Sequence, residues 1–349
     1  QGFPDFPVAK ELIDHVKEAM MQGVNQYSPM PGLPILREAI SKKIRHTYQI
    51  EVNPETEITV TAGGTQALYA AFTAIINPGD EVIVFDPAYD SYNPAIRLNG
   101  GIPIHLHLKT PDFNIDWDEV ESRISNRTRA IIINTPHNPS GAVLSDSDMN
   151  RLANIINAHN LYLISDEVYE HIIFDGFVHN SALKYPELRP RTIAIYSFGK
   201  TFHATGWKTG YMVAPADISV ELRKMHQFIV FSANAPIQHG IANYLAEGDH
   251  YSYLNEFFQT KRDQFQGLMS ATKFTAVPCH GTYFQLYSYE NISDKDDRTV
   301  AEWITKEFKV ASIPASVFYE NGEGIKYLRF CFAKSLQTME QAVERLCKI

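Results

Sequence analysis

The sequence predicts an α/β protein in which helices cover both faces of a mostly parallel, seven-stranded sheet, with a smaller α+β unit attached. Strand-like apolar runs alternate with helical patterns between residues 57 and 213, a rhythm typical of such sheets. After residue 218 helical patterns dominate, and only two strand-like runs follow. Polar residues and glycines also follow several of the expected strands, at the edge where open α/β sheets bind ligands.

The first part of the chain is expected to be helical. Apolar residues at helical spacing predict a helix over 8–22, ended by Gly23, and a second one over 33–44 after a proline-rich loop. The helix over 8–22 precedes the main sheet, so we expect it to pack with the C-terminal unit. We therefore divide the chain into residues 1–24 as the N-terminal part of a small domain, 25–248 as a large domain, and 249–349 as the C-terminal small domain.

The remaining elements are predicted from the hydrophobic periodicity and from the turn-forming residues between periodic segments. The strands of the main sheet are expected at 57–61, 81–85, 102–108, 130–134, 161–165, 192–197 and 210–213, with helices at 65–76, 89–98, 116–124 and 146–158. Later helices are expected at 218–230, 236–247, 251–271, 300–308 and 339–347, with strands at 282–289 and 326–332.

Composition argues against several classes of protein. The net charge of −9, with no basic cluster, argues against a nucleic-acid partner. No apolar run has the length of a membrane helix, and nothing resembles a signal peptide, so we expect a cytoplasmic protein without membrane contact. The three cysteines lack metal or redox spacing. His105 and His107 share a strand face, but no third ligand is near in sequence, so we expect no metal.

Lys200 is the first candidate for chemistry. It follows the apolar run 192–196, so it should emerge at the carboxyl end of that strand. Lys208, eight residues later, is a second cation that would favour loss of a proton from Lys200. A neutral amine attacks aldehydes, which makes Lys200 a candidate Schiff-base lysine, while a solvated surface lysine is the alternative.

Two further segments follow strands. Gly63, Gly64 and Thr65 join a strand to a helix, and the free amides at that helix start could bind a phosphate. A tight turn that needs glycine is the alternative. Tyr89 follows the next strand and could stack on a planar cofactor, although a core aromatic is also compatible with its position.

Four polar residues complete the set. Asn138 lies in a loop stiffened by two prolines and could offer a fixed donor, or belong to a plain turn. Asp166 ends an apolar strand, where a carboxylate needs a cation such as a protonated ring nitrogen, and Tyr169 lies three residues on. Arg329 is expected within an apolar strand, where it needs either an anionic ligand or an internal ion pair.

The order of these features resembles that of the fold-type I pyridoxal-phosphate aminotransferases of class I/II, over practically the whole chain. Within that family the segments 1–6, 27–32, 86–92, 199–208 and 281–284 are most similar to the methionine and kynurenine (glutamine transaminase K-like) subgroup. Aspartate-type members carry arginine where Lys208 stands, whereas the kynurenine and methionine branch uses lysine.

The resemblance implies the roles of the reactive residues. Lys200 would hold pyridoxal phosphate in a Schiff base and later move a proton. Asp166 would keep the ring nitrogen protonated, Asn138 and Tyr169 would bind the phenolate oxygen, and Tyr89 would stack on the ring.

The resemblance also implies how phosphate and substrate are held. The expected phosphate ligands are Gly64, Thr65, Ser197, Lys208 and, from the neighbouring subunit of a homodimer, Tyr27. Arg329 and Asn138 would clamp the substrate carboxylate, and the backbone near Gly2 would close over it.

The expected activity is ping-pong transfer of an amino group from an amino acid to a 2-oxo acid. Phe3, Tyr27, Tyr92 and Phe231 could line an apolar side-chain pocket, which favours methionine, then aromatic amino acids or kynurenine. A kynurenine or glutamine transaminase and a cysteine-S-conjugate (carbon–sulfur) β-lyase on the same fold are the alternatives. A regulatory pyridoxal-phosphate domain is disfavoured because no basic helix-turn-helix segment is present, and a nicotinamide dehydrogenase because its glycine motif is missing.

Overall fold

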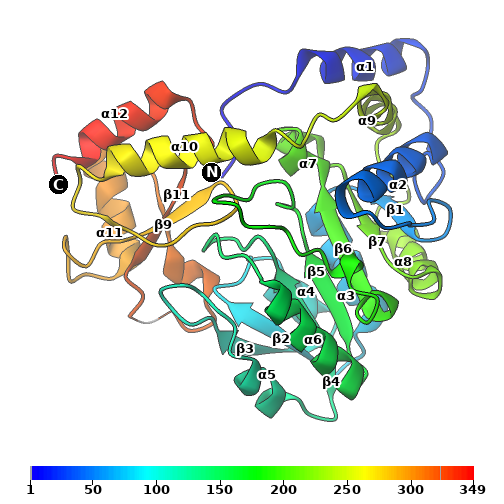
Figure 1. The fold of residues 1–349 in the computed structure, drawn as a ribbon, viewed down its shortest axis with the longest axis horizontal. Helices are drawn as coiled ribbons and strands as arrows, with labels where there is room; N and C mark the ends of the chain where they lie inside the picture. Colours follow the sequence, from blue (N-terminus) through cyan, green and yellow to red (C-terminus); the bar gives the residue numbers. More distant parts are fainter. Residues whose placement is uncertain (1, 323) are drawn as a thin grey trace.

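The computed structural model describes residues 2–322 and 324–349, so Gln1 of the N-terminal motif lies outside the described residues. Figure 1 shows the large sheet with its helices on one side of the molecule and the helices α10, α11 and α12 on the other. Within the described residues, no helix is both long enough and apolar enough to cross a membrane.

The large sheet contains the seven predicted strands, and its mostly parallel character is confirmed. They are β1 (Ile58–Thr61), β2 (Glu81–Asp86), β3 (Ile102–His107), β4 (Thr128–Asn134), β5 (Tyr162–Asp166), β6 (Thr192–Ser197) and β7 (Gly210–Val213). Their order is β1-β7-β6-β5-β4-β2-β3. Only β7 runs antiparallel to its neighbours. Because Asn134 pairs with Asp166 in register, the carboxyl ends of β4 and β5 meet at one edge.

Helices cover both faces of this sheet because its strands are apolar on both sides. Val82 and Val84 face the cluster built with α3 (Gly64–Ile75), α4 (Tyr92–Leu98) and α8 (Ala216–Ile229). Ile83 and Phe85 alternate to the other face, under α5 (Trp117–Arg123) and α6 (Asp146–His159).

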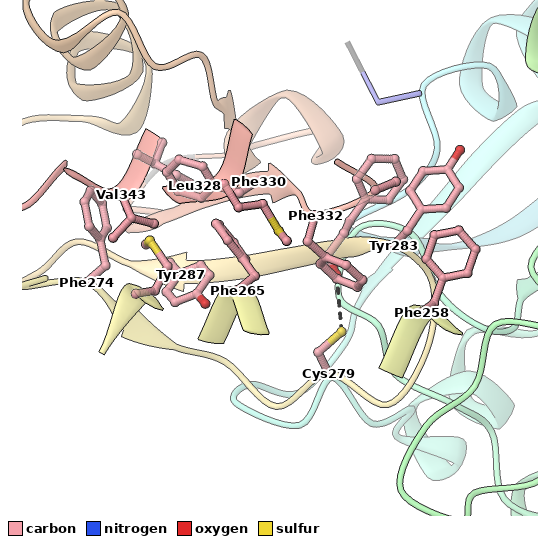
Figure 2. Packing of buried hydrophobic residues seen from close by; sticks show 14 of the residues in the cluster. Phe258, Phe265, Phe274, Cys279, Tyr283, Tyr287, Leu328, Phe330, Phe332 and Val343 are labelled. Carbon is pink, nitrogen blue, oxygen red and sulfur yellow. Dashed lines mark hydrogen bonds between the residues drawn. The ribbon is translucent and has the colours of Figure 1, made fainter. Parts of the chain in front are cut away.

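The C-terminal unit has its own four-stranded antiparallel sheet, in the order β10 (Ile313–Pro314), β11 (Tyr327–Cys331), β9 (Phe284–Ser288), β8 (Thr275–Ala276). Beside it lie α10 (Leu254–Met269), α11 (Asp297–Trp303) and α12 (Leu336–Leu346). The core of this unit is rich in aromatic rings, as Figure 2 shows. The strands β8 and β10 were not predicted, because two residues are too few to show an alternating pattern.

The N-terminal residues contact both units. The helix α1 (Lys10–Met21) lies along α9 (Ala235–Glu247), and its Leu12 and Val16 share a core cluster with α2 (Pro34–Tyr48) and β1. A methyl group on Gly240 would lie only 2.4 Å from Val16, so glycine permits this close approach. Phe6, in contrast, packs on the aromatic core of the C-terminal unit. The division into domains at residues 24 and 248 stays a proposal.

Candidate active site

A cavity opens at the carboxyl edge of the large sheet, and nine of the predicted residues line it. They are Gly64, Thr65, Tyr89, Asn138, Asp166, Tyr169, Ser197, Lys200 and Lys208. These residues are separated by up to 144 positions in the chain, yet each ends or follows a strand, starts the next helix or, for Lys208, precedes the antiparallel strand β7. The topology of the sheet therefore brings them together.

Lys200 reaches the cavity from the short helix α7 (Phe198–Thr201), which follows β6 without a loop. Its Nζ donates a hydrogen bond to the hydroxyl of Tyr283, at 2.8 Å. The same Nζ lies 5.3 Å from the ring centres of Tyr169 and of Tyr283. The amine of Lys200 thus faces aromatic side chains within the cavity.

Asp166 is the buried acid of the cavity. Its Oδ2 accepts a hydrogen bond from the Tyr92 hydroxyl at 2.6 Å, and its Oδ1 accepts one from the amide of Val168 at 3.4 Å. Burial raises the pKa of Asp166 to about 6, although the bond from Tyr92 opposes this rise. A cation bound in the cavity would stabilise the charged form of this buried carboxylate.

Tyr92 also contacts Asp166. We predict it among residues lining an apolar side-chain pocket; its ring is buried and lines a small apolar cavity, and its hydroxyl donates to Asp166. The predicted helix over 89–98 begins only at Tyr92, after a turn in which the Tyr92 amide donates to the Tyr89 carbonyl. Tyr89 is therefore a loop residue whose ring lines the cavity.

One end of the cavity is suited to an anion. The helix α3 begins at Gly64 without a side-chain cap, and Gly63 before it has φ = 85°, a conformation that favours glycine. A methyl group on Gly63 would lie 3.5 Å from Cε of Lys208, so this cation stands beside the helix start. The hydroxyl of Thr65 lies 3.3 Å from that of Tyr89. Amides, hydroxyls and a cation together can bind a phosphate.

Arg329 is half-buried, and no described residue of opposite charge pairs with it. Its Nη1 donates to Oδ1 of Asn138 at 2.8 Å, and its guanidinium lies 3.9 Å from the ring centre of Phe284 and 4.9 Å from that of Phe318. Burial lowers the pKa of Arg329. No carboxylate among the described residues forms an ion pair with it, so the predicted internal ion pair is absent there and the charge can receive an anionic ligand.

The N-terminal segment reaches the site from another direction. The carbonyl of Gly2 accepts a hydrogen bond from the Tyr283 hydroxyl at 3.2 Å, and a methyl group on Gly2 would lie 3.6 Å from Nη2 of Arg329. The carbonyl of Phe3 accepts one from Lys334 at 2.7 Å, while its ring is 47% exposed. Gly2 is thus placed beside Arg329, and its closing over a bound substrate stays a prediction.

Six predicted residues do not line this cavity within the chain. Gly2, Phe3 and Arg329 line a second cavity, Tyr92 lines a third, and Tyr27 and Phe231 lie at the surface. Tyr27 is 84% exposed, and its ring meets that of Phe231 edge-on with centres 5.1 Å apart. Neither Tyr27 nor Phe231 is one of the described residues that line the cavity. Within one chain, the side-chain pocket that we predicted from these aromatics is therefore not assembled.

Three residues near the site were not predicted to act there. Asn134 accepts the Asn138 amide at 2.7 Å and donates to the Asp166 carbonyl at 2.9 Å. Val168 lines the cavity, and a methyl group on Gly64 would lie 3.1 Å from it. Tyr283 contacts Lys200 directly. The position of Asn134 at the end of a predicted strand could have identified it as a site residue. Tyr283 belongs to the segment 281–284 that resembles the family, but the sequence assigned it no role.

The donor set fits pyridoxal phosphate. An anion site, a flat aromatic ring, a buried carboxylate and an amine lie around one cavity. Ser197, Thr65, Lys208 and the amides of α3 would hold the phosphate, and Asp166 would face the ring nitrogen. His105, which we had considered as a metal ligand, bonds Oδ1 of Asp86 at 2.8 Å instead.

Comparison with known proteins gives consistent results. The family model described as aminotransferase class I and II matches residues 1–346. The chain is 48% identical to the methionine aminotransferase of Escherichia coli, over 99% of this chain and 90% of that protein. It is 32% identical to kynurenine–oxoglutarate transaminase 3 of Rattus norvegicus, over 99% of this chain and 83% of that protein.

The fold of the chain is also similar to that of solved aminotransferase structures. A crystal structure from Escherichia coli, reported to identify a methionine aminotransferase function, superposes with a TM-score of 0.98 at 48% identity and covers 100% of this chain and 93% of that chain. The N-succinyldiaminopimelate aminotransferase of Mycobacterium tuberculosis superposes with a TM-score of 0.96 at 34% identity, over 100% of this chain and 92% of that chain.

Proposed function

The chain belongs to the class I and II aminotransferases of fold type I, which use pyridoxal phosphate, and we propose that it transfers the amino group of methionine to a 2-oxo acid. Other hydrophobic, sulfur-containing or aromatic amino acids are further donors in this proposal. The observation that carries it is the single cavity shared by the amine of Lys200 and the carboxylate of Asp166. The 48% identity to a methionine aminotransferase supports methionine as the first donor.

Each side chain has a part in the proposed reaction. The bound cofactor supplies an aldehyde and an electron-withdrawing ring. Lys200 would supply the amine that binds this aldehyde and would later move the proton of the substrate α-carbon, since it lines the cavity together with Asp166 and Tyr169. Asp166 would stabilise a positive ring nitrogen by its charge, and Tyr89 would pack against the ring. Asn138 and Tyr169 would orient the phenolate side of the ring.

The substrate carboxylate is assigned to Arg329 and Asn138. The guanidinium lies without an ion pair among the described residues and its planar fork matches a carboxylate. Gly2 approaches this guanidinium, so the N-terminal segment would cover the bound substrate and exclude water. The reaction would be ping-pong, because the first oxo acid leaves before the second enters.

A homodimer and a cytoplasmic location are further parts of the proposal. The exposed ring of Tyr27 supports the dimer, since it would reach the phosphate in the neighbouring subunit and not in its own. Three free cysteines support a reducing compartment.

The test is a half-reaction screen. The cofactor-loaded protein is mixed with one amino acid at a time, without an oxo acid, and the loss of its visible absorbance is followed. We expect methionine to react fastest, and the Lys200→Ala protein to show no loss with any amino acid. If the absorbance is lost faster with kynurenine or glutamine than with methionine, that amino acid is the preferred donor and the proposal of methionine is wrong. Release of pyruvate and thiol from a cysteine S-conjugate, without need for an oxo acid, would indicate the β-lyase instead.

A further inference from the structure

Tyr283 has the closest contact to the reactive amine. Its hydroxyl lies 2.8 Å from Nζ of Lys200 and 3.2 Å from the carbonyl of Gly2. Its ring is fully buried, between Phe258 and Phe284 with ring centres 5.8 and 4.8 Å away. Figure 2 shows Tyr283 at one end of the aromatic cluster, with its hydroxyl directed away from the other labelled rings. The cluster thus fixes the ring and presents the hydroxyl to Lys200.

The two contacts of this hydroxyl determine its hydrogen bonds. A tyrosine hydroxyl has one proton to donate, and a backbone carbonyl can only accept. The proton of Tyr283 is therefore committed to Gly2, and the hydroxyl oxygen is left to accept an N–H of Lys200. Burial raises the pKa of Tyr283 well above its usual range, so the hydroxyl keeps its proton. An amine held through an N–H keeps its lone pair free for attack.

The Gly2 carbonyl belongs to a segment docked on the C-terminal unit. The Asp5 amide donates to the Ala333 carbonyl at 3.2 Å, and Lys334 donates to the Phe3 carbonyl at 2.7 Å. If the Gly2 carbonyl moves away, the Tyr283 hydroxyl has lost its acceptor and can donate its proton to the lone pair of the Lys200 amine. That bond would oppose attack by the amine.

We propose that Tyr283 is a positioning residue that holds Lys200 with its lone pair free, and that the docked N-terminal segment sets the direction of this hydrogen bond. The inference rests on the proposed function, since it assigns Tyr283 a role through Lys200. Docking of the N-terminal segment beside Arg329 would thereby affect the reactivity of the Lys200 amine.

The variant that tests it is Tyr283→Phe, which keeps the ring and removes the hydroxyl. Tyr287→Phe is a matched control, because Tyr287 is buried in the same cluster and its hydroxyl has no partner among the described residues. The first readout does not require turnover: cofactor-free protein is mixed with pyridoxal phosphate, and the rate at which the visible band appears is measured. The second readout is kcat and KM for methionine.

For Tyr283→Phe we expect both the rate of band formation and kcat to fall about tenfold, as for the loss of one hydrogen bond, with KM changed less than about twofold. Tyr287→Phe should match the wild type in all three. Lys334→Met, which releases the Phe3 carbonyl, should lower the same rate about threefold in the wild type and leave Tyr283→Phe unchanged. Equal rates for Tyr283→Phe and Tyr287→Phe would overturn the inference. Failure of wild-type protein to attach the cofactor at all would instead overturn the proposed function.

Discussion

The two sides of the proposed site are built differently. On the side of the large sheet, Asp166 ends β5 and Lys200 lies on α7 directly after β6, and the contacts around Asp166 are buried. On the other side, Arg329 comes from the small sheet and lines a second cavity with Gly2 and Phe3, which belong to a segment held by hydrogen bonds from Tyr283 and Lys334. The comparison indicates that the proposed cofactor side is built from the buried strand ends of one sheet, and that the proposed substrate side combines the small sheet with the N-terminal segment.

The largest effect is expected on the sheet side. Lys200→Ala removes the nucleophile and the proton carrier together, so we expect steady-state transamination of methionine to fall more than about 1,000-fold. Because the anion site of α3 and Lys208 is untouched, the variant should still bind pyridoxal phosphate by equilibrium dialysis. Retention of wild-type turnover would contradict the role of Lys200.

Asp166→Asn tests the buried charge without changing the shape of the side chain. We expect kcat to fall about 100-fold, the scale measured when one preorganised electrostatic contact is lost from an active site. The melting temperature of the cofactor-free variant should not fall, since a buried carboxylate with a raised pKa destabilises the fold at neutral pH. An unchanged kcat would mean that Asp166 does not face the reacting ring.

Arg329→Lys probes the substrate side. Lysine keeps the charge but loses the planar fork, so we expect kcat/KM for methionine to fall about 30-fold while the visible absorbance of the bound cofactor stays unchanged. Arg345→Lys, the same change at an exposed position of α12, is the control and should be neutral. A loss of cofactor from Arg329→Lys would show that the two sides are not separate.

Tyr92→Phe sharpens the comparison through pH. The pKa of Asp166 is about 6, so the charged carboxylate predominates above that pH, and uptake of cofactor should weaken as pH falls through it. The Tyr92 hydrogen bond lowers this pKa; its removal should therefore move the midpoint to higher pH, by about 0.5 to 1 unit. Absorbance titrations of cofactor-free protein on either side of pH 6 measure the midpoint. A shift to lower pH would have the wrong sign.

Phe3→Ala should have the smallest effect. The ring is 47% exposed, so its removal should raise KM for methionine only about two- to threefold. Alanine as donor is the internal control, because its methyl group is too short to use an apolar pocket. An equal rise in KM for both donors would place Phe3 outside the side-chain pocket.

The sheet side was largely predictable from the sequence. The strands β6 and β7 have the predicted bounds, because their buried runs begin and end sharply. The parallel register of β4, β5 and β6 then places Asn134, Asp166 and Ser197 at one edge. The positions of Lys200 and Asp166 follow from these local patterns and from the rule that ligands bind at the carboxyl ends of strands.

Contacts between distant segments were not predictable in the same way. Tyr283 meets Lys200 across 83 positions, and Tyr92 meets Asp166 across 74. Periodicity shows which face a side chain lies on, but not which hydroxyl its neighbour will need. The N-terminal chain illustrates the same point, since Phe6 packs on the C-terminal unit while Leu12 packs beside α9.

The central claim is tested most directly by reducing the cofactor-loaded protein with borohydride and mapping the modified peptide by mass spectrometry. The account predicts that the pyridoxyl group is attached to Lys200 alone, and that prior exposure to methionine prevents the attachment. A pyridoxyl group on another lysine, such as Lys208, or none at all, would contradict it.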